Sequence, residues 1–82
     1  MARKSIHDPF YRATIAILLE RREMLGWSQA ELGAKLGRRQ QYVSRYEKFE
    51  RRLDLIEYCD IAHALGLDGA AEVGRLWRTA QT

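Results

Sequence analysis

Residues 27 to 37, WSQAELGAKLG, carry the strongest local signal in the sequence. Ser28 is followed three residues later by Glu31, which is a capping box in which each side chain hydrogen-bonds to the other residue's backbone amide. Gly37 then supplies the residue best suited to a left-handed helix stop. These signals predict a short helix that begins at Gln29 and ends near Leu36.

Gly33 lies inside this predicted helix, where glycine costs about 1 kcal/mol relative to alanine. A close approach of another part of the chain at this position would offset the cost. A tight turn between two short helices requires such an approach, so we expect a second helix to follow at once.

The second short helix is predicted from Arg39 or Gln40 to about Lys48. At about 100° per residue, its polar side chains share one arc of roughly 140°, while Val43 and Tyr46 point the other way. Gln and Arg can form paired hydrogen bonds with adenine and guanine, although either residue is also common on a wet helix surface. The polar face consists of Gln40, Gln41, Ser44, Arg45 and Lys48.

Positive charge is concentrated in the same part of the chain. Residues 35 to 52 contain seven Lys or Arg and two Glu, so this segment is +5, whereas the whole chain is +3 and the remainder is therefore −2. A local basic patch is typical of nucleic-acid binders. An ordinary solvated face is the alternative, and the coincidence of the patch with two short helices argues against it.

Asp caps predict three further helices, over residues 9 to 25, over 55 to 65 and from 69 to the end of the domain at 79, and glycine stops end the first two. No strand signal or repeat is present, so the expected fold is all-α with five helices. We expect a basic arm over residues 1 to 8, one domain over 9 to 79 and a frayed tail over 80 to 82. The side chains expected to face the core are Tyr11, Ile15, Leu18, Leu19 and Leu25, then Leu55, Cys59, Ala62 and Leu65, and finally Val73, Leu76 and Trp77.

Composition and cysteine usage exclude several classes of protein. A chain of 82 residues with 46% hydrophobic and 30% charged residues is a folded single domain rather than a disordered tail. The sequence has no apolar run long enough to span a bilayer and no signal-peptide pattern, so we expect a cytoplasmic protein. The single Cys59 cannot form an internal disulfide and is expected to be a small buried side chain.

Catalytic and metal-binding patterns are not evident. His7 and His63 have no Cys or acidic partner at metal-ligand spacing. The sequence contains no nucleophile beside a base and no glycine-rich phosphate loop. We therefore expect no enzyme activity, no cofactor, no metal and no small-molecule ligand.

The two short helices together resemble the helix-turn-helix of the XRE family, the class of the phage repressors and Cro. The likeness is carried by SQAELGAKLG at 28 to 37 and QQYVSRYE at 40 to 47, and it extends over roughly residues 11 to 68. It implies a five-helix, lambda-repressor-like domain in which the second helix of the pair enters the DNA major groove. The resemblance assigns base reading to Gln40, Gln41, Ser44 and Arg45, and a backbone phosphate contact to Gln29.

Charge and location add further candidates for phosphate contact. Tyr42 either packs on the scaffold or reaches a phosphate with its hydroxyl, and Glu47 points away from the polar front and is expected to be structural. Arg3 and Lys4 in the arm either reach DNA or belong to a frayed terminus. The phosphate candidates besides Gln29 are Arg38, Arg39, Tyr42, Lys48, Arg51 and Arg52.

Two positions depart from the family pattern. Arg39 stands where the family usually has Ser or Pro, which weakens the cap of the second short helix. Phe49 stands where the family usually has Gly, and a bulky side chain is disfavoured in the left-handed conformation. We therefore expect this helix to run on for a turn, or the linker to take another path.

The sequence thus favours a transcriptional regulator, a repressor, that binds double-stranded DNA. We expect it to be encoded by a bacterium or a phage and to be associated with the nucleoid. By the resemblance, it would act as a dimer on an inverted repeat, with a contact through Val73, Leu76 and Trp77 of the last helix. The alternative is an antitoxin-like module that neutralises a partner protein and regulates its own operon. An extra exposed apolar surface would favour this alternative.

Overall fold

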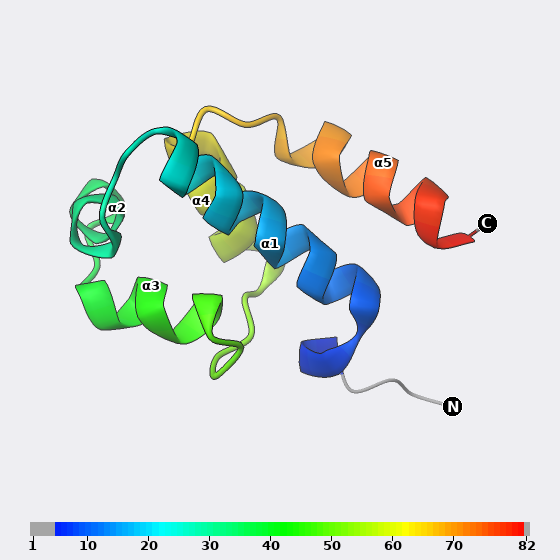
Figure 1. The fold of residues 1–82 in the computed structure, drawn as a ribbon, viewed down its shortest axis with the longest axis horizontal. Helices are drawn as coiled ribbons and strands as arrows, with labels where there is room; N and C mark the ends of the chain where they lie inside the picture. The colour runs from blue at the N-terminus through cyan, green and yellow to red at the C-terminus, as the bar shows by residue number, and fades with distance from the viewer. Residues whose placement is uncertain (1–4, 82) are drawn as a thin grey trace.

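The computed structural model describes residues 5 to 81, which form five α-helices after one short 3-10 helix (Figure 1). The described part of the chain contains no strand, so the predicted all-α architecture is confirmed. Arg3 and Lys4, the two candidates in the basic arm, lie outside the described residues. The elements are η1 (Ser5–His7), α1 (Pro9–Met24), α2 (Gln29–Leu36), α3 (Gln40–Glu47), α4 (Leu55–Ala64) and α5 (Gly69–Gln81).

Side-chain caps begin every α-helix except α3. The capping box of Ser28 and Glu31 is complete, with both hydrogen bonds present, and Asp54 forms a second complete box with Glu57. Asp8 caps α1 and Asp68 accepts from an amide in the first turn of α5. α3 begins without a side-chain cap, as the sequence predicts, so its position depends on contacts with the rest of the fold.

The turn after α3 corrects one prediction. Phe49 has a φ of 61° and ends α3 in the left-handed conformation that glycine takes after α1, α2 and α4. The Phe49 amide donates to the Tyr46 carbonyl at 3.2 Å and the Glu50 amide to the Arg45 carbonyl at 2.9 Å, the bond pair of a Schellman motif. The expectation that α3 would run on was therefore wrong.

A contact from α1 helps to explain why Phe49 tolerates this conformation. The guanidinium carbon of Arg12 lies 4.4 Å from the centroid of the Phe49 ring. Such a cation–π contact contributes about 0.5–1 kcal/mol, whereas a left-handed residue with a Cβ costs about 1–2 kcal/mol. Arg12 also bonds to the carbonyl of Ile6 and the ring of His7, so it joins η1 to the α3–α4 turn.

The core lies where α1 crosses the other helices. In Figure 1, α2 and α3 lie at one end of α1, α4 lies behind it, and α5 lies on the side away from α3. The largest fully buried side chains come from α1 to α4, together with the residue that follows α4, so the pair α2–α3 is anchored on the same core as α1. The core residues are Ile15, Leu18, Leu32, Val43, Tyr46, Leu53, Tyr58, Ile61, Ala62 and Leu65.

α4 is rotated relative to its predicted orientation. Cys59 is exposed and Leu55 is 76% exposed, so both were wrongly assigned to the core. The buried face instead runs through Tyr58 and Ile61. Apolar residues occur on several sides of α4, so their spacing does not define one face, and packing against α1, α2 and α5 selects the rotation. Leu25, at the end of α1, is 36% exposed and was also wrongly assigned.

α5 covers the core without contributing a fully buried side chain. Val73 packs against the core and Leu76 is half-buried, whereas Trp77 is 43% exposed and rests edge-on against Phe10, with the ring centroids 5.1 Å apart. The helix runs to Gln81, so it includes residues 80 and 81 of the expected frayed tail.

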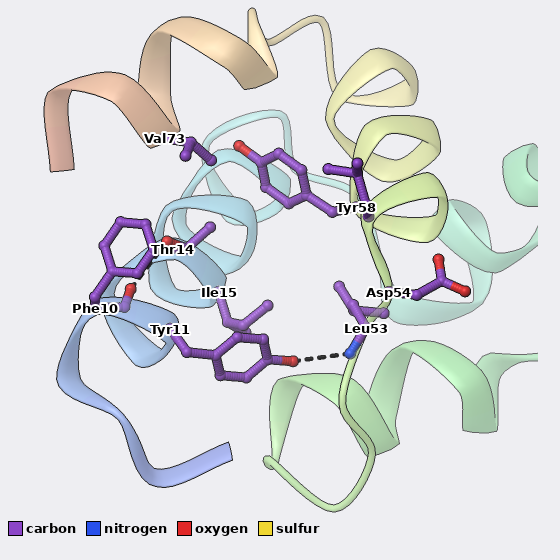
Figure 2. Close-up of a pocket in the computed structure, with 9 residues that line it drawn as sticks. Phe10, Tyr11, Thr14, Ile15, Leu53, Asp54, Tyr58 and Val73 are labelled. Carbon is purple, nitrogen blue, oxygen red and sulfur yellow. Dashed lines mark hydrogen bonds between the residues drawn. The ribbon is translucent and has the colours of Figure 1, made fainter. Parts of the chain in front are cut away.

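A small apolar cavity of about 160 Å³ lies between α1, α4 and α5 (Figure 2). Phe10, Tyr58 and Val73 line it. At its edge, the hydroxyl of Tyr11 accepts a hydrogen bond of 3.0 Å from the amide of Leu53. This bond fixes the linker between α3 and α4 on α1.

The hydroxyl of Tyr46 leads to a prediction about stability. The side chain is 0% exposed, and its hydroxyl has no hydrogen-bond partner among the described residues. An unsatisfied buried polar group costs about 1–3 kcal/mol, so Tyr46→Phe should raise the free energy of unfolding by about 1 kcal/mol. The matched control is Tyr58→Phe, which removes a 2.8 Å bond to the Gly69 carbonyl and should lower it. Urea unfolding of both variants measures this, and destabilisation by Tyr46→Phe would contradict it.

Candidate nucleic-acid interface

α2 and α3 approach so closely that glycine is required at Gly33. A Cβ built at this position would lie 2.9 Å from the carbonyl oxygen of Arg38 and 3.2 Å from that of Arg39. Both neighbours are backbone atoms of the turn, so they cannot move aside as a flexible side chain would. The close approach expected from the mid-helix glycine is therefore present.

The polar front of α3 faces solvent. Gln40, Gln41, Arg45 and Lys48 are exposed and Ser44 is half-buried. On the opposite side, Val43 and Tyr46 are both 0% exposed. The structure thus brings the sequence-predicted base-reading residues together on one outward face, backed by the core.

One flank of this face is held by a buried ion pair. Arg22 of α1 donates to Glu47 of α3 through two bonds, from Nε to Oε2 at 2.7 Å and from Nη2 to Oε1 at 3.0 Å. Both side chains are at most 11% exposed. Arg22 also donates from Nη1 to the Trp27 carbonyl at 2.7 Å, which ties the start of α2 to the same group.

The ion pair continues into a chain of hydrogen bonds that reaches the surface. Gln29 donates from Nε2 to Oε1 of Glu47 at 2.8 Å, and Gln40 donates from Nε2 to Oε1 of Gln29 at 3.4 Å. Because an ionised carboxylate only accepts, Glu47 fixes the direction of every bond in the chain. Gln40 therefore keeps one N–H and its carbonyl oxygen for a ligand, a donor–acceptor pair that adenine matches in the major groove.

The other flank is held by a group that we call the Tyr42 clamp, made of Arg38, Tyr42, Arg51 and Glu57. The guanidinium carbons of Arg38 and Arg51 lie 4.7 Å and 5.0 Å from the Tyr42 ring centroid. Arg51 also forms a two-bond ion pair with Glu57, at 3.0 Å and 2.7 Å. Glu57 belongs to the capping box of α4, so the clamp joins α3 to the start of α4.

The acid side of the clamp predicts a dependence of stability on pH. The hydrogen bonds from Arg51, followed by that from the Asp54 amide, lower the pKa of Glu57 from 4.5 to about 2. A carboxyl whose pKa is lower in the folded state stabilises the fold above its unfolded pKa and loses this effect as the pH falls through the folded pKa. The free energy of unfolding should therefore decline between about pH 4.5 and 2.

Comparison with a Glu57→Gln variant isolates this contribution from other carboxyl groups. The difference between the two proteins should be about 1 kcal/mol at pH 7, since solvent screens an ion pair whose arginine is 39% exposed. The difference should shrink as the pH falls from 4.5 to 2 and disappear below pH 2, where Glu57 is protonated in the folded state as well, and a difference that stays at its neutral-pH size near pH 2 would contradict the assignment.

The basic candidates lie at both ends of α3. Arg38 and Arg39 precede it and are exposed, and Lys48 and Arg52 follow it and are exposed as well. Arg51 differs because it is engaged with Glu57.

Two functional groups were not assigned from the sequence. No local pattern marked Arg22 as a partner of α3. The available signal was Glu47, because an acid that points away from the polar face needs a cation beside it. Glu57 was recognised as a cap but not as a partner of Arg51.

Within residues 5 to 81, no three His, Cys, Asp or Glu side chains are grouped so that they could hold a metal ion. None of the helices described is long and apolar enough to cross a membrane.

Comparison with known proteins agrees with this geometry. A helix-turn-helix family model matches residues 18–70. A solved structure, the XRE-family like protein from Pseudomonas syringae pv. tomato str. DC3000, is similar with a TM-score of 0.84 and 43% sequence identity, over 93% of each chain. No curated protein matches the chain. The chain therefore belongs to the XRE family of helix-turn-helix proteins, a family of DNA-binding transcription regulators.

Proposed function

We propose that this protein is a sequence-specific transcription repressor that reads the major groove of double-stranded DNA with α3. The observation that carries this proposal is the outward face of α3, which is polar, exposed and braced on both flanks. Bracing matters because base recognition depends on side chains held in a fixed geometry. The proposed base-reading residues are Gln40, Gln41, Ser44 and Arg45.

Phosphate contacts would hold α3 in register on the duplex. Gln29, at the start of α2, lies beside Gln40 and keeps a second amide hydrogen for a phosphate oxygen. The exposed cations at the two ends of α3 suit the phosphates that flank the groove. We assign phosphate contact to Gln29, Arg38, Arg39, Lys48 and Arg52.

A dimer on an inverted repeat would place two copies of α3 about 34–36 Å apart, one turn of DNA. α5 supports such an assembly because it leaves Trp77 43% exposed beside the half-buried Val73 and Leu76. Selection of bound DNA from a random pool tests the function and the assembly together. We expect a short palindrome whose half-sites are one helical turn apart, and enrichment of no sequence would overturn the proposal.

A variant of α3 should separate base reading from phosphate contact. Gln41→Ala should lose about 1–3 kcal/mol of discrimination at one base pair, because only the specific contact is removed. The control Lys48→Ala should weaken binding to all sequences about equally and reduce the slope of log affinity against log salt by about 1. Fluorescence anisotropy at graded salt measures both effects, and equal behaviour of the two variants would contradict the division of roles.

A second candidate function is supported by a separate surface. Leu55 and Ile56, at the start of α4, are 76% and 72% exposed, which is unusual for large apolar side chains. An antitoxin-like module would use such a surface to bind a partner protein while α3 binds its operator. Expression together with neighbouring genes tests this candidate: a partner that is retained by the wild type and released by Leu55→Ser would support it.

A further inference from the structure

The two flanks of α3 are held in different ways. At about 100° per residue, Gln40 and Tyr42 lie about 200° apart around the helix, so they bound the polar face on opposite sides. The Gln40 side is fixed by hydrogen bonds that lead to the buried Glu47. The Tyr42 side is fixed by guanidinium groups, and the ring also meets the buried Tyr46 edge-on, with 5.9 Å between centroids.

Arg51 is held at the Tyr42 flank by hydrogen bonds. Its Nη1 and Nη2 both donate to the Glu57 carboxylate, and Nη1 also reaches the Arg52 carbonyl at 3.4 Å. The Glu57 carboxylate compensates the charge of Arg51, which lowers its value as a phosphate ligand. Arg38, by contrast, is exposed and forms no ion pair among the described residues, so its charge is available to DNA.

We propose that Arg51 and Glu57 are positioning residues, which act through the Tyr42 ring to fix the rotation of α3 and the location of Arg38. The inference rests on the proposed function, and it removes Arg51 and the Tyr42 hydroxyl from the phosphate contacts. α3 has eight residues and no side-chain cap, so its flanking contacts set its orientation. With Gln40 held on one side and Tyr42 on the other, the polar face can turn in neither direction.

Three substitutions separate the clamp from direct phosphate contact. Arg51→Lys keeps the charge but loses the paired geometry and the planar stacking group, so the clamp predicts lost discrimination while phosphate contact predicts little change. Glu57→Gln changes DNA binding in opposite directions under the two explanations. It weakens the clamp and should reduce discrimination, whereas a phosphate-binding Arg51 would be released by it and bind DNA more tightly. Tyr42→Phe keeps the ring and should behave as wild type, whereas loss of a hydroxyl–phosphate contact would weaken binding.

The experiment combines hydrogen exchange of the α3 amides in the DNA-free protein with binding to the selected operator and to a single-base variant. For Arg51→Lys and Glu57→Gln we expect discrimination between the operator and its single-base variant to fall about fivefold, which corresponds to the loss of one exposed cation–π contact. The α3 amides should exchange faster, and the slope of log affinity against log salt should not change. Arg75→Lys, in the exposed Arg75–Glu72 pair of α5, is the matched control outside the clamp and the DNA-contact set, and it should change neither readout. Circular dichroism verifies that each variant is folded.

Two results would overturn the clamp. One is unchanged α3 exchange in Arg51→Lys and Glu57→Gln. The other is tighter binding of Glu57→Gln to all sequences with a steeper salt slope, which would make Arg51 a phosphate ligand. A third result concerns the proposed function alone. If α3 exchange becomes faster in Arg51→Lys and Glu57→Gln, but the wild type prefers no DNA sequence, the clamp is upheld and the reader function is contradicted. Failure of the clamp and failure of the proposed function are therefore distinguishable.

Discussion

Replacing Glu47 with alanine should lower the free energy of unfolding by about 3–5 kcal/mol, because removing one partner of a buried ion pair leaves the other charge uncompensated. Arg22, the charge left behind, is only 11% exposed on its side chain. Small domains are stabilised by about 5–15 kcal/mol in total, so Glu47→Ala should be marginally folded at room temperature. Urea unfolding followed by circular dichroism measures the loss.

A double variant separates stability from DNA recognition. Replacing both partners of a buried pair with apolar side chains is often neutral or stabilising, so Arg22→Met with Glu47→Leu should unfold near the wild-type midpoint. The double variant should nevertheless lose discrimination at the base pair read by Gln40, because Gln29 no longer has the acceptor that orients it. A loss below about 1 kcal/mol for Glu47→Ala would contradict the buried-charge explanation.

Local signals explain why the helix boundaries could be predicted. A capping box needs only two residues three positions apart, as at Ser28 and Asp54, and a glycine stop is a property of one residue, as at Gly37. Neither depends on the tertiary fold. The polar face of α3 was predictable for a similar reason, because a helix of eight residues with Val43 and Tyr46 on one side has one apolar back.

Contacts between distant segments account for the errors. Arg12, on another helix, stacks on the ring of Phe49 and offsets part of the cost of its left-handed conformation, and no pattern near Phe49 contains that information. The rotation of α4 is set by its neighbours, so Cys59 and Leu55 face solvent although their spacing also fitted a buried stripe.

Local sequence patterns also did not predict the two groups that hold α3, the Arg22–Glu47 ion pair and the Tyr42 clamp. Arg22 reaches Glu47 from α1, and Arg51, in the linker, contacts both the Tyr42 ring on α3 and Glu57 on α4. The sequence therefore indicated which side chains of α3 face solvent, while the structure indicates how they are held. For the proposed reader function, in which a short helix must be correctly oriented, the second is as important as the first.

Gly33→Val should lower the free energy of unfolding by about 3 kcal/mol, the upper end of the range for overpacking a well-packed site. Even the Cβ of alanine would meet the Arg38 carbonyl oxygen at 2.9 Å, so Gly33→Ala should lose about 1–2 kcal/mol although alanine is the better helix former. The clash forces α2 and the turn apart, which moves Gln29 away from Gln40 and should reduce operator discrimination in the folded fraction as well.

The matched control for this prediction is Gly74→Ala in the interior of α5. There a Cβ would meet only the flexible end of Arg78, at an ordinary 3.5 Å, so alanine should stabilise the fold by about 0.4–1 kcal/mol through the unfolded chain. Opposite signs for the same substitution in two helices would show that the backbone approach, not helix propensity, determines the residue at Gly33. Stabilisation by Gly33→Ala would mean that α2 and α3 can separate freely, and the rigid presentation of α3 on which base reading depends would then be lost.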